Sequence, residues 1–256
     1  GIRFDMNALY TKTDTHGGGS YSGMTSVLQS PIMGGTYFTE DELINTQTRL
    51  ILNGLNTNYG ATNQLIENAA VVTRKVQNLY SVNGGIEIDL PYGLVWRTAG
   101  SYKYSDEKST KFADENSYNY LVGNASGMEG SIEYKQNTNW QITNTLRWSH
   151  TLNKVHRLDL LAGQEVTHAE SEGMKVELAQ FPNPNFGLDD ISNTTVTSKK
   201  TSHSHSGIVS VFGRANYNYD DRYLLTATIR TDVSTKFARG HRWGVFPSAA
   251  AAWRIS

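Results

Sequence analysis

The residues of this chain that could do chemistry are few, and His203 and His205 are the first pair to consider. Two imidazoles at positions i and i+2 project from the same face of a strand, and imidazole is a common metal ligand. No third ligand stands at a defined spacing from this pair. A Ser- and His-rich junction between a loop and a strand is therefore the favoured interpretation, and we expect no metal site.

Two other motifs also fail as chemical sites. Asp189 and Asp190 could form a carboxylate pair, but adjacent residues of a strand point to opposite faces, so we expect them only to solvate a loop. The three glycines at 17–19 lack the Lys-Ser/Thr pair of a phosphate-binding loop. No serine elbow or His–Asp constellation appears in the sequence. The sequence predicts no enzyme and no cofactor.

Composition narrows the class of protein. The 256 residues have a net charge of −1, with basic and acidic residues interspersed, so we expect no nucleic-acid partner. The absence of cysteine excludes disulfides and Cys-ligated metals. Mean hydropathy is −0.47 and no apolar run reaches 18 residues, which excludes a transmembrane helix. A transmembrane β-barrel stays possible, because its strands alternate and average out as polar.

Apolar and polar residues alternate in eight stretches, which predicts eight strands. Leu9, Leu161 and Phe246 depart from the alternation without erasing it. The predicted strands cover residues 2–11, 80–90, 94–104, 132–148, 157–166, 209–219, 222–232 and 242–256.

Short and long connections alternate between these strands. The segments 90–94, 151–157 and 219–223 are tight, whereas 12–70, 105–130, 170–205 and 234–242 are long. Short turns at one end and long loops at the other are typical of outer-membrane barrels. Inside the loop 12–70, a capping box at 39–42 and a glycine at 54 predict one short helix near 40–53.

Alternation by itself does not say whether the apolar face meets lipid or the core of a soluble sheet. Tyr and Trp gather near the strand ends, as they do at bilayer interfaces, although aromatics favour strands anywhere. The polar face carries mixed charge, which suits a hydrated lumen. Eight strands closed on themselves would leave no room for so many charged side chains. We therefore expect an all-β antiparallel meander that forms an arc of a larger barrel.

Residues 212–256 closely resemble the SusC/RagA family of TonB-linked outer-membrane transporters. The resemblance rests on "FGRANYNYDDRYLLTATIRTD", "STKF" and "RWGVFPSAAAAWRIS". The hairpins "GIEIDLPYGLVWRTAGSYKYS" (85–105) and "NTNWQITNTLRWSHTLNKVHRLDLLAGQE" (138–165) also look like the family. Val233 and Ala252 stand where the family usually has glycine, which leaves the local bulge geometry in doubt.

The resemblance implies a barrel of up to about 22 strands occluded by a plug. It implies import of an oligosaccharide or peptide that a SusD-like surface lipoprotein captures, with energy supplied through TonB. The location implied is the outer membrane of a Gram-negative, Bacteroidetes-like bacterium, with the barrel in contact with its lipid. Residues 1–256 read as a mid-barrel segment without the plug or the TonB box.

On this interpretation, odd positions of 216–237 face lipid and even positions line the lumen, with the Asp220–Asp221 turn at the periplasmic rim. The loop aromatics are candidate substrate contacts, although ordinary loop packing is the simpler role for any one of them. Two rival functions remain: a passive porin-like or structural barrel, and a soluble β-sheet binding module. The expected lumen-facing residues are Arg97, Arg147, Arg214, Arg222, Arg230 and Arg254, and the candidate substrate contacts are Tyr118, Tyr120, Phe181 and Phe186.

Overall fold

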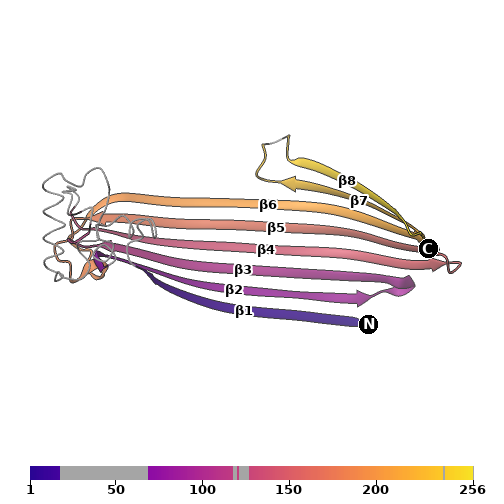
Figure 1. Cartoon of the computed structure of the whole chain (residues 1–256), viewed down its shortest axis with the longest axis horizontal. Helices are drawn as coiled ribbons and strands as arrows, with labels where there is room; N and C mark the ends of the chain where they lie inside the picture. Colours follow the sequence, from indigo (N-terminus) through magenta and orange to yellow (C-terminus); the bar gives the residue numbers. More distant parts are fainter. Residues whose placement is uncertain (18–68, 118–119, 121–126, 239, 256) are drawn as a thin grey trace.

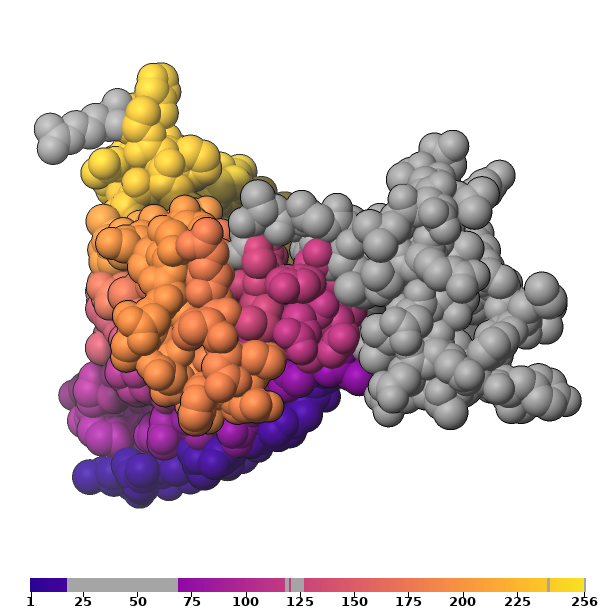
Figure 2. All heavy atoms as spheres, turned by 90° about the vertical axis from the view of Figure 1, so that its left-hand side faces the viewer, coloured from indigo at the N-terminus to yellow at the C-terminus, as the bar shows by residue number. Residues whose placement is uncertain are grey.

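The chain forms one antiparallel sheet in which every strand pairs with its sequence neighbours (Figure 1). The computed structural model describes residues 1–17, 69–117, 120, 127–238 and 240–255. The eight-stranded meander predicted from the sequence is confirmed. Its strands are β1 (Ile2–Gly17), β2 (Val71–Asp89), β3 (Leu94–Ala113), β4 (Glu129–Leu152), β5 (His156–Ala179), β6 (Thr195–Tyr219), β7 (Tyr223–Ser234) and β8 (Trp243–Trp253). Viewed from the end of the long connections, their colours run from indigo β1 to yellow β8 (Figure 2).

Three tight turns join strands at one end of the sheet (Figure 1). Asp220 and Asp221 both adopt positive φ, 52° and 51°, and the Arg222 N–H donates to the Tyr219 carbonyl at 3.0 Å. Two consecutive left-handed residues define a turn whose twist matches that of the flanking strands, and Asp tolerates this conformation. The β4–β5 turn, at Asn153 and Lys154, repeats the pattern with φ of 48° and 63°.

The third tight turn, between β2 and β3, is the 3₁₀ turn η2 (Pro91–Gly93). The long connections lie at the opposite end of the sheet, except that the shorter β7–β8 hairpin ends part-way along β6 (Figure 1). The predicted asymmetry between short turns and long connections is therefore confirmed.

The strands are longer than the alternation predicted. β5 has 24 residues and β6 has 25, and the strands include 12–17, 105–113, 170–179 and 195–205, which were expected to be loops. That expectation was wrong, because most of these residues are polar on both faces, and the short alternating stretch at 174–178 is cut off from the rest of its strand by the polar residues 170–173. The helix predicted near 40–53 lies outside the described residues.

The register is regular at both positions where the family has glycine. Val233 pairs with Trp243 and Ala252 pairs with Leu224, each in an unbroken ladder. Among the described pairings, a register shift occurs between Glu177 and Leu178 of β5. The strand pairing therefore continues without a bulge at Val233 and at Ala252.

The two faces of the sheet differ in chemistry. The apolar face contains a cross-strand row of Met6, Gly84, Gly100, Ile142, Val166, Val209, Val233 and Trp243. The polar face contains the row Asp5, Gly85, Ala99, Thr143, Glu165, Ser210, Asp232 and Gly244. Every strand exposes large apolar side chains; for example, Phe4 of β1 is 70% exposed and Trp253 of β8 is 64% exposed. No second layer therefore covers the sheet within the described structure.

A small core forms where the long connections begin. Met128, Leu178 and Phe181 are buried there, and Phe112, Val176 and Leu188 pack against them. The loop after β5, which includes the 3₁₀ turn η3 (Gly187–Asp189), thus folds back onto the ends of β3 and β5. Within the described ranges, no helix has the length and apolar character needed to cross a membrane.

Candidate functional site

Four of the six predicted lumen-facing arginines project from the polar face. Arg97 and Arg230 lie in one cross-strand row. Arg147 and Arg214 lie in the next row toward the tight turns, where Leu161 pairs with both of them. The other two, Arg222 and Arg254, lie just beyond strand ends. A backbone hydrogen bond of 2.8 Å from Arg254 N–H to the Arg222 carbonyl joins these two positions.

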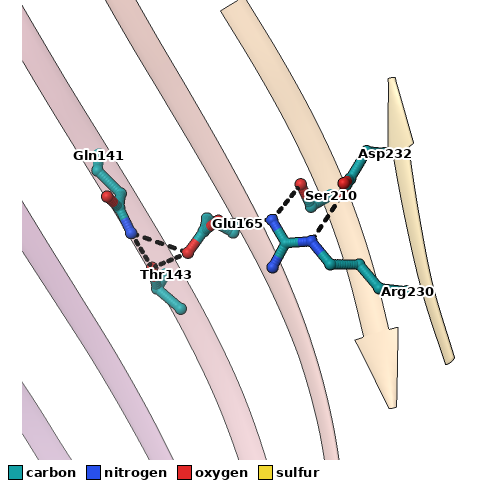
Figure 3. A network of polar contacts seen from close by, with 6 residues as sticks. All are labelled: Gln141, Thr143, Glu165, Ser210, Arg230 and Asp232. Atoms are coloured by element: carbon teal, nitrogen blue, oxygen red, sulfur yellow. Dashed lines mark hydrogen bonds and ion pairs between the residues drawn. The ribbon is translucent and has the colours of Figure 1, made fainter. Parts of the chain in front are cut away.

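Arg230 is the centre of a polar network that crosses four strands (Figure 3). Its Nη2 donates to Glu165 Oε1 and to Ser210 Oγ, both at 2.8 Å, and its Nε donates to Asp232 Oδ1 at 2.7 Å. On the far side, Glu165 Oε2 accepts from Gln141 Nε2 at 2.8 Å. Ser210 lies beneath the guanidinium and is only 1% exposed. The charges of this network are paired and hydrogen-bonded, as partly buried charges must be.

A phenyl ring supports the same arginine from the turn side. The Arg230 guanidinium lies 5.6 Å from the centroid of the Phe212 ring, within cation–π range. Phe212 pairs across the strands with Gly163, and the ring covers the space where a Cβ of Gly163 would stand. Only glycine leaves room for this ring, so Gly163 and Phe212 together fix the height of Arg230 above the sheet.

A second network links the first three strands on the polar face. Arg97 Nη2 lies 3.0 Å from Asp5 Oδ1, and Arg97 Nη1 lies 3.6 Å from Glu87 Oε2. Arg3 Nη2 lies 2.6 Å from Glu87 Oε1 and 2.8 Å from Asp89 Oδ1. These side chains are 25–64% exposed, so solvent screens the ion pairs and each contributes little to stability. Their effect is to fill the polar face with alternating fixed charges.

A polar hollow of about 280 Å³ opens where β3, β4 and β5 approach the long connections. Lys111, Lys175 and Glu177 line it, with Ser131 between them. Lys175 Nζ donates to Glu177 Oε1 at 2.6 Å, and this hydrogen bond lowers the pKa of Glu177 and raises that of Lys175. Lys111 makes no ion pair with any other described residue. Sequence reasoning missed this hollow because it placed 105–113 and 170–179 in loops.

Three of the four candidate substrate contacts lie among the described residues. Tyr118 lies outside the described residues, Tyr120 is 40% exposed and Phe186 is 57% exposed. Phe181 is only 4% exposed, and its ring meets that of Phe112 edge to face at 5.1 Å. Phe181 therefore packs inside the loop, which is the simpler role expected for a loop aromatic. The ring of Phe186 is exposed and could contact a ligand. Their contact with substrate stays a prediction.

Two rows of aromatic rings cross the apolar face. A loop-side row and a turn-side row each bring neighbouring strands into ring contact, for example Tyr10 with Tyr80 at 5.0 Å and Tyr219 with Tyr223 at 6.2 Å. Apolar side chains and small residues fill the space between the rows. Both rows run obliquely across the strand register: the loop-side row is Tyr10, Tyr80, Tyr102, Tyr104, Trp140, His168 and Trp243, and the turn-side row is Trp96, Trp148, His150, His156, Tyr217, Tyr219, Tyr223 and Trp253.

Polar groups hold several of these rings. Trp148 Nε1 donates to the Tyr92 carbonyl at 3.0 Å, and the Tyr10 hydroxyl donates to Asn78 Oδ1 at 3.0 Å. The His156 ring nitrogen Nδ1 lies 2.7 Å from the Tyr217 hydroxyl. Each ring therefore has an apolar body over the sheet and a polar tip with a partner, which is the side-chain design found at membrane interfaces.

The model of the family described as "TonB dependent receptor-like, beta-barrel" matches residues 4–256. TonB-dependent receptor P26 of Formosa agariphila is 31% identical over 177 residues, covering 68% of this chain and 18% of the relative. TonB-dependent receptor SusC of Bacteroides thetaiotaomicron is 31% identical over 142 residues, covering 53% of this chain and 13% of the relative. The chain thus spans about a fifth or less of the length of these relatives.

Solved structures show the same fold. The RagAB peptide importer in its open-open state superposes with a TM-score of 0.70 at 18% identity, covering 97% of this chain and 27% of that one. The Escherichia coli outer membrane transporter YddB superposes with a TM-score of 0.51 at 11% identity, covering 72% of this chain and 24% of that one. The resemblance to SusC and RagA is confirmed, and the chain belongs to the TonB dependent receptor-like β-barrel family.

Proposed function

We propose that this chain is an arc of the barrel of a TonB-dependent outer-membrane transporter that imports glycans or peptides. The apolar face would contact lipid and the polar face would line the lumen. The names of the relatives support this proposal: one is SusC and another is a peptide importer. They are receptors and transporters rather than enzymes, in agreement with the expected absence of catalysis.

One observation carries the proposal: an apolar band bounded by two aromatic rows, on a sheet whose other face is charged. Tyr104 lies eight positions after Trp96 on β3, and Trp253 lies ten positions after Trp243 on β8. At about 3.3 Å per residue these are roughly 26 and 33 Å along the strand. Strands tilted by about 40° would reduce this to roughly 20–25 Å, close to the apolar band of outer-membrane barrels.

The polar face supports the lumenal role in a second way. Its ion pairs are largely exposed, which requires water beside them, and a narrow closed barrel could not supply that. A wide barrel can, and the unpaired outer edges of β1 and β8 within the described sheet would continue into further strands of it. Arg147 and Arg214 would then project into the water-filled path.

The remaining elements of the proposal follow from the family. A SusD-like lipoprotein would deliver the oligosaccharide or peptide from the cell surface, and TonB would supply the energy through segments outside the barrel arc. The polar hollow beside Lys111 and Lys175 and the exposed ring of Phe186 lie toward the long connections, where an arriving ligand would first meet the barrel.

Labelling tests the assignment of faces. Because this chain has no cysteine, single cysteines can be introduced in the intact receptor after removal of any cysteines elsewhere. Thr228→Cys and Thr226→Cys on the polar face should react with a water-soluble maleimide. Leu225→Cys and Ile229→Cys should resist it and react instead with a lipid-soluble reagent. Equal reaction of all four, from a chain found in a soluble fraction, would favour the soluble binding module.

Uptake tests the coupling. Cells that express the intact receptor should lose uptake of its glycan or peptide when TonB is deleted. Uptake that continues unchanged without TonB, together with the labelling pattern above, would favour the passive porin-like barrel.

A further inference from the structure

We propose that Glu170, Glu172 and His203, assisted by His205, form a binding site for one divalent transition-metal ion such as Zn²⁺. The site lies on the same side of the sheet as the aromatic rows, beyond the loop-side row. It therefore faces away from the proposed lumen and is independent of import.

The sheet register brings the ligands together. Glu172 of β5 pairs directly with His203 of β6, and Glu170 pairs with His205. The four side chains thus occupy two consecutive cross-strand pairs on one face, where directly opposed Cβ atoms lie about 4.5–5.5 Å apart. The sequence shows the two histidines but places the two glutamates more than thirty positions earlier.

Distances between donor atoms fit a shared ion. The His203 ring lies between the two carboxylates, with Nδ1 3.2 Å from Glu172 Oε1 and Nε2 3.8 Å from Glu170 Oε1, and one of these nitrogens would bind the ion. One donor atom from each of the three residues lies within 4.8 Å of the others. Ligands of a tetrahedral zinc stand about 3.4 Å apart, given bonds of about 2.0–2.1 Å. These side chains are 39–59% exposed, so they have room to rotate toward a shared ion.

The choice of metal follows from the donor set. Imidazole with carboxylate suits zinc, copper or nickel, whereas Ca²⁺ and Mg²⁺ prefer oxygen ligands throughout. His205 lies beside His203, with 5.8 Å between ring centroids, and pairs with Glu170 across the strands, so its side chain would have to turn toward the ion to supply a fourth ligand. On the other side, His168 Nε2 lies 3.9 Å from Glu170 Oε2 and stacks on Trp140 at 5.6 Å. His168 can therefore orient the Glu170 carboxylate toward the ion.

The position gives the ion a structural role. The site lies just outside the apolar band, where residues 170–173 of β5 and 197–206 of β6 carry polar side chains or glycine on both faces. There is no apolar core to hold the two strands together at this height, within the described structure. An ion bound by Glu170 and Glu172 of β5 and by His203 of β6 would clamp the two strands.

Equilibrium dialysis against a competing zinc chelator tests the site in the intact receptor, purified without a polyhistidine tag. We expect His203→Gln to weaken Zn²⁺ binding at this site at least tenfold. The double variant E170Q/E172Q should lose one equivalent of zinc. These side chains are exposed and the substitutions keep their size, so folding should be preserved. Altered gel migration on heating checks that the barrel is intact.

His16→Gln is the matched control. His16 lies on the same face, with Nε2 3.1 Å from Asp14 Oδ1, but Arg74 engages that carboxylate and no second one is near in the described structure. Its zinc stoichiometry should equal that of the parent. Zinc binding unchanged in H203Q and in the double variant would overturn the proposal. The parent should also give a visible Co²⁺ absorption band that Zn²⁺ displaces, and its absence would overturn the proposal whatever the variants do.

Discussion

Arg230 on β7 reaches Glu165 on β5 across the full width of β6, with 2.8 Å between Nη2 and Oε1. The two residues are 65 positions apart in the sequence. Ser210 on β6 lies between them and accepts a second hydrogen bond from the same nitrogen. The guanidinium therefore joins three consecutive strands from the polar face.

Loss of this guanidinium should destabilise the sheet. Arg230→Gln leaves Glu165, which is 19% exposed, without its charged partner. We expect a cost on the order of 1 kcal/mol, between the values typical of exposed ion pairs and of buried hydrogen bonds to charged groups, because the arginine is 37% exposed and solvent partly screens the pair. Thermal unfolding of the intact receptor in detergent measures it.

Arg214→Gln is the matched control, since Arg214 lies on the same face and makes no ion pair with any other described residue. It should leave the melting temperature unchanged. Glu165→Gln in the R230Q background should restore part of the loss, because the less exposed of the two carboxylates that Arg230 pairs is then neutral. Equal melting temperatures for R230Q and R214Q would contradict the role assigned to the network.

Gly163→Ala should displace the Phe212 ring from the sheet. The new Cβ would stand where the ring now lies, and the ring also supports Arg230. Overpacking of this kind costs about 1–3 kcal/mol. In the control Gly100→Ala, the nearest atom to the new Cβ is the Gln141 carbonyl oxygen at 3.8 Å, an ordinary contact. A melting temperature lowered by G163A but not by G100A is the expected result, and equal values would count against the ring's role.

Alanine variants of Phe181 and Phe186 should have different effects, because we expect Phe181 to pack in the small core and Phe186 to contact a ligand. Phe181→Ala empties the small core around Leu178, and we expect a local loss of about 3 kcal/mol. Hydrogen exchange of residues 176–182 should speed up. Phe186→Ala removes a 57% exposed ring and should leave exchange unchanged while weakening substrate binding, if this ring contacts the ligand. Unchanged binding in F186A would remove Phe186 from the candidate contacts.

Asp114 should give the folded protein a pH dependence of unusual sign. Burial raises the pKa of Asp114 above its ordinary 3.8, although the Asn116 N–H donates to its Oδ1 at 2.8 Å. The folded state thus holds this proton more tightly, so the free energy of unfolding falls as pH rises from 3.8 through the raised pKa. Asp114→Asn removes this titration and keeps an oxygen to accept the Asn116 hydrogen bond.

The D114N variant should therefore melt above the parent at about pH 7 and converge with it below the ordinary carboxyl pKa of about 3.9. Asp14→Asn should show the opposite sign. A hydrogen bond from Arg74 lowers the pKa of Asp14, so its stabilisation is present above 3.8 and is lost as pH falls through the lowered pKa. Parallel melting curves across this pH range for D114N and the parent would contradict the prediction.

The sequence by itself determined the fold class and the two faces. In the strand 223–232, Leu225 and Ile229 alternate with Thr226, Thr228 and Arg230, and the structure keeps the two sets on opposite faces. The tight turn at Asp220–Asp221 could also be predicted, because Asp accepts the left-handed conformation. These features are local, so the order of residues along one strand is enough to specify them.

Strand length and register were decided by the tertiary structure. Alternation appears only where the two faces of a strand meet different surroundings. Residues 170–173 and 197–205 carry polar side chains or glycine on both faces, so their pairing leaves no periodic signal. The contacts of Glu165 with Arg230, and of His203 with Glu170 and Glu172, depend on which residues stand opposite each other across strands. Backbone hydrogen bonds between distant segments fix that register, and no spacing within one segment encodes it.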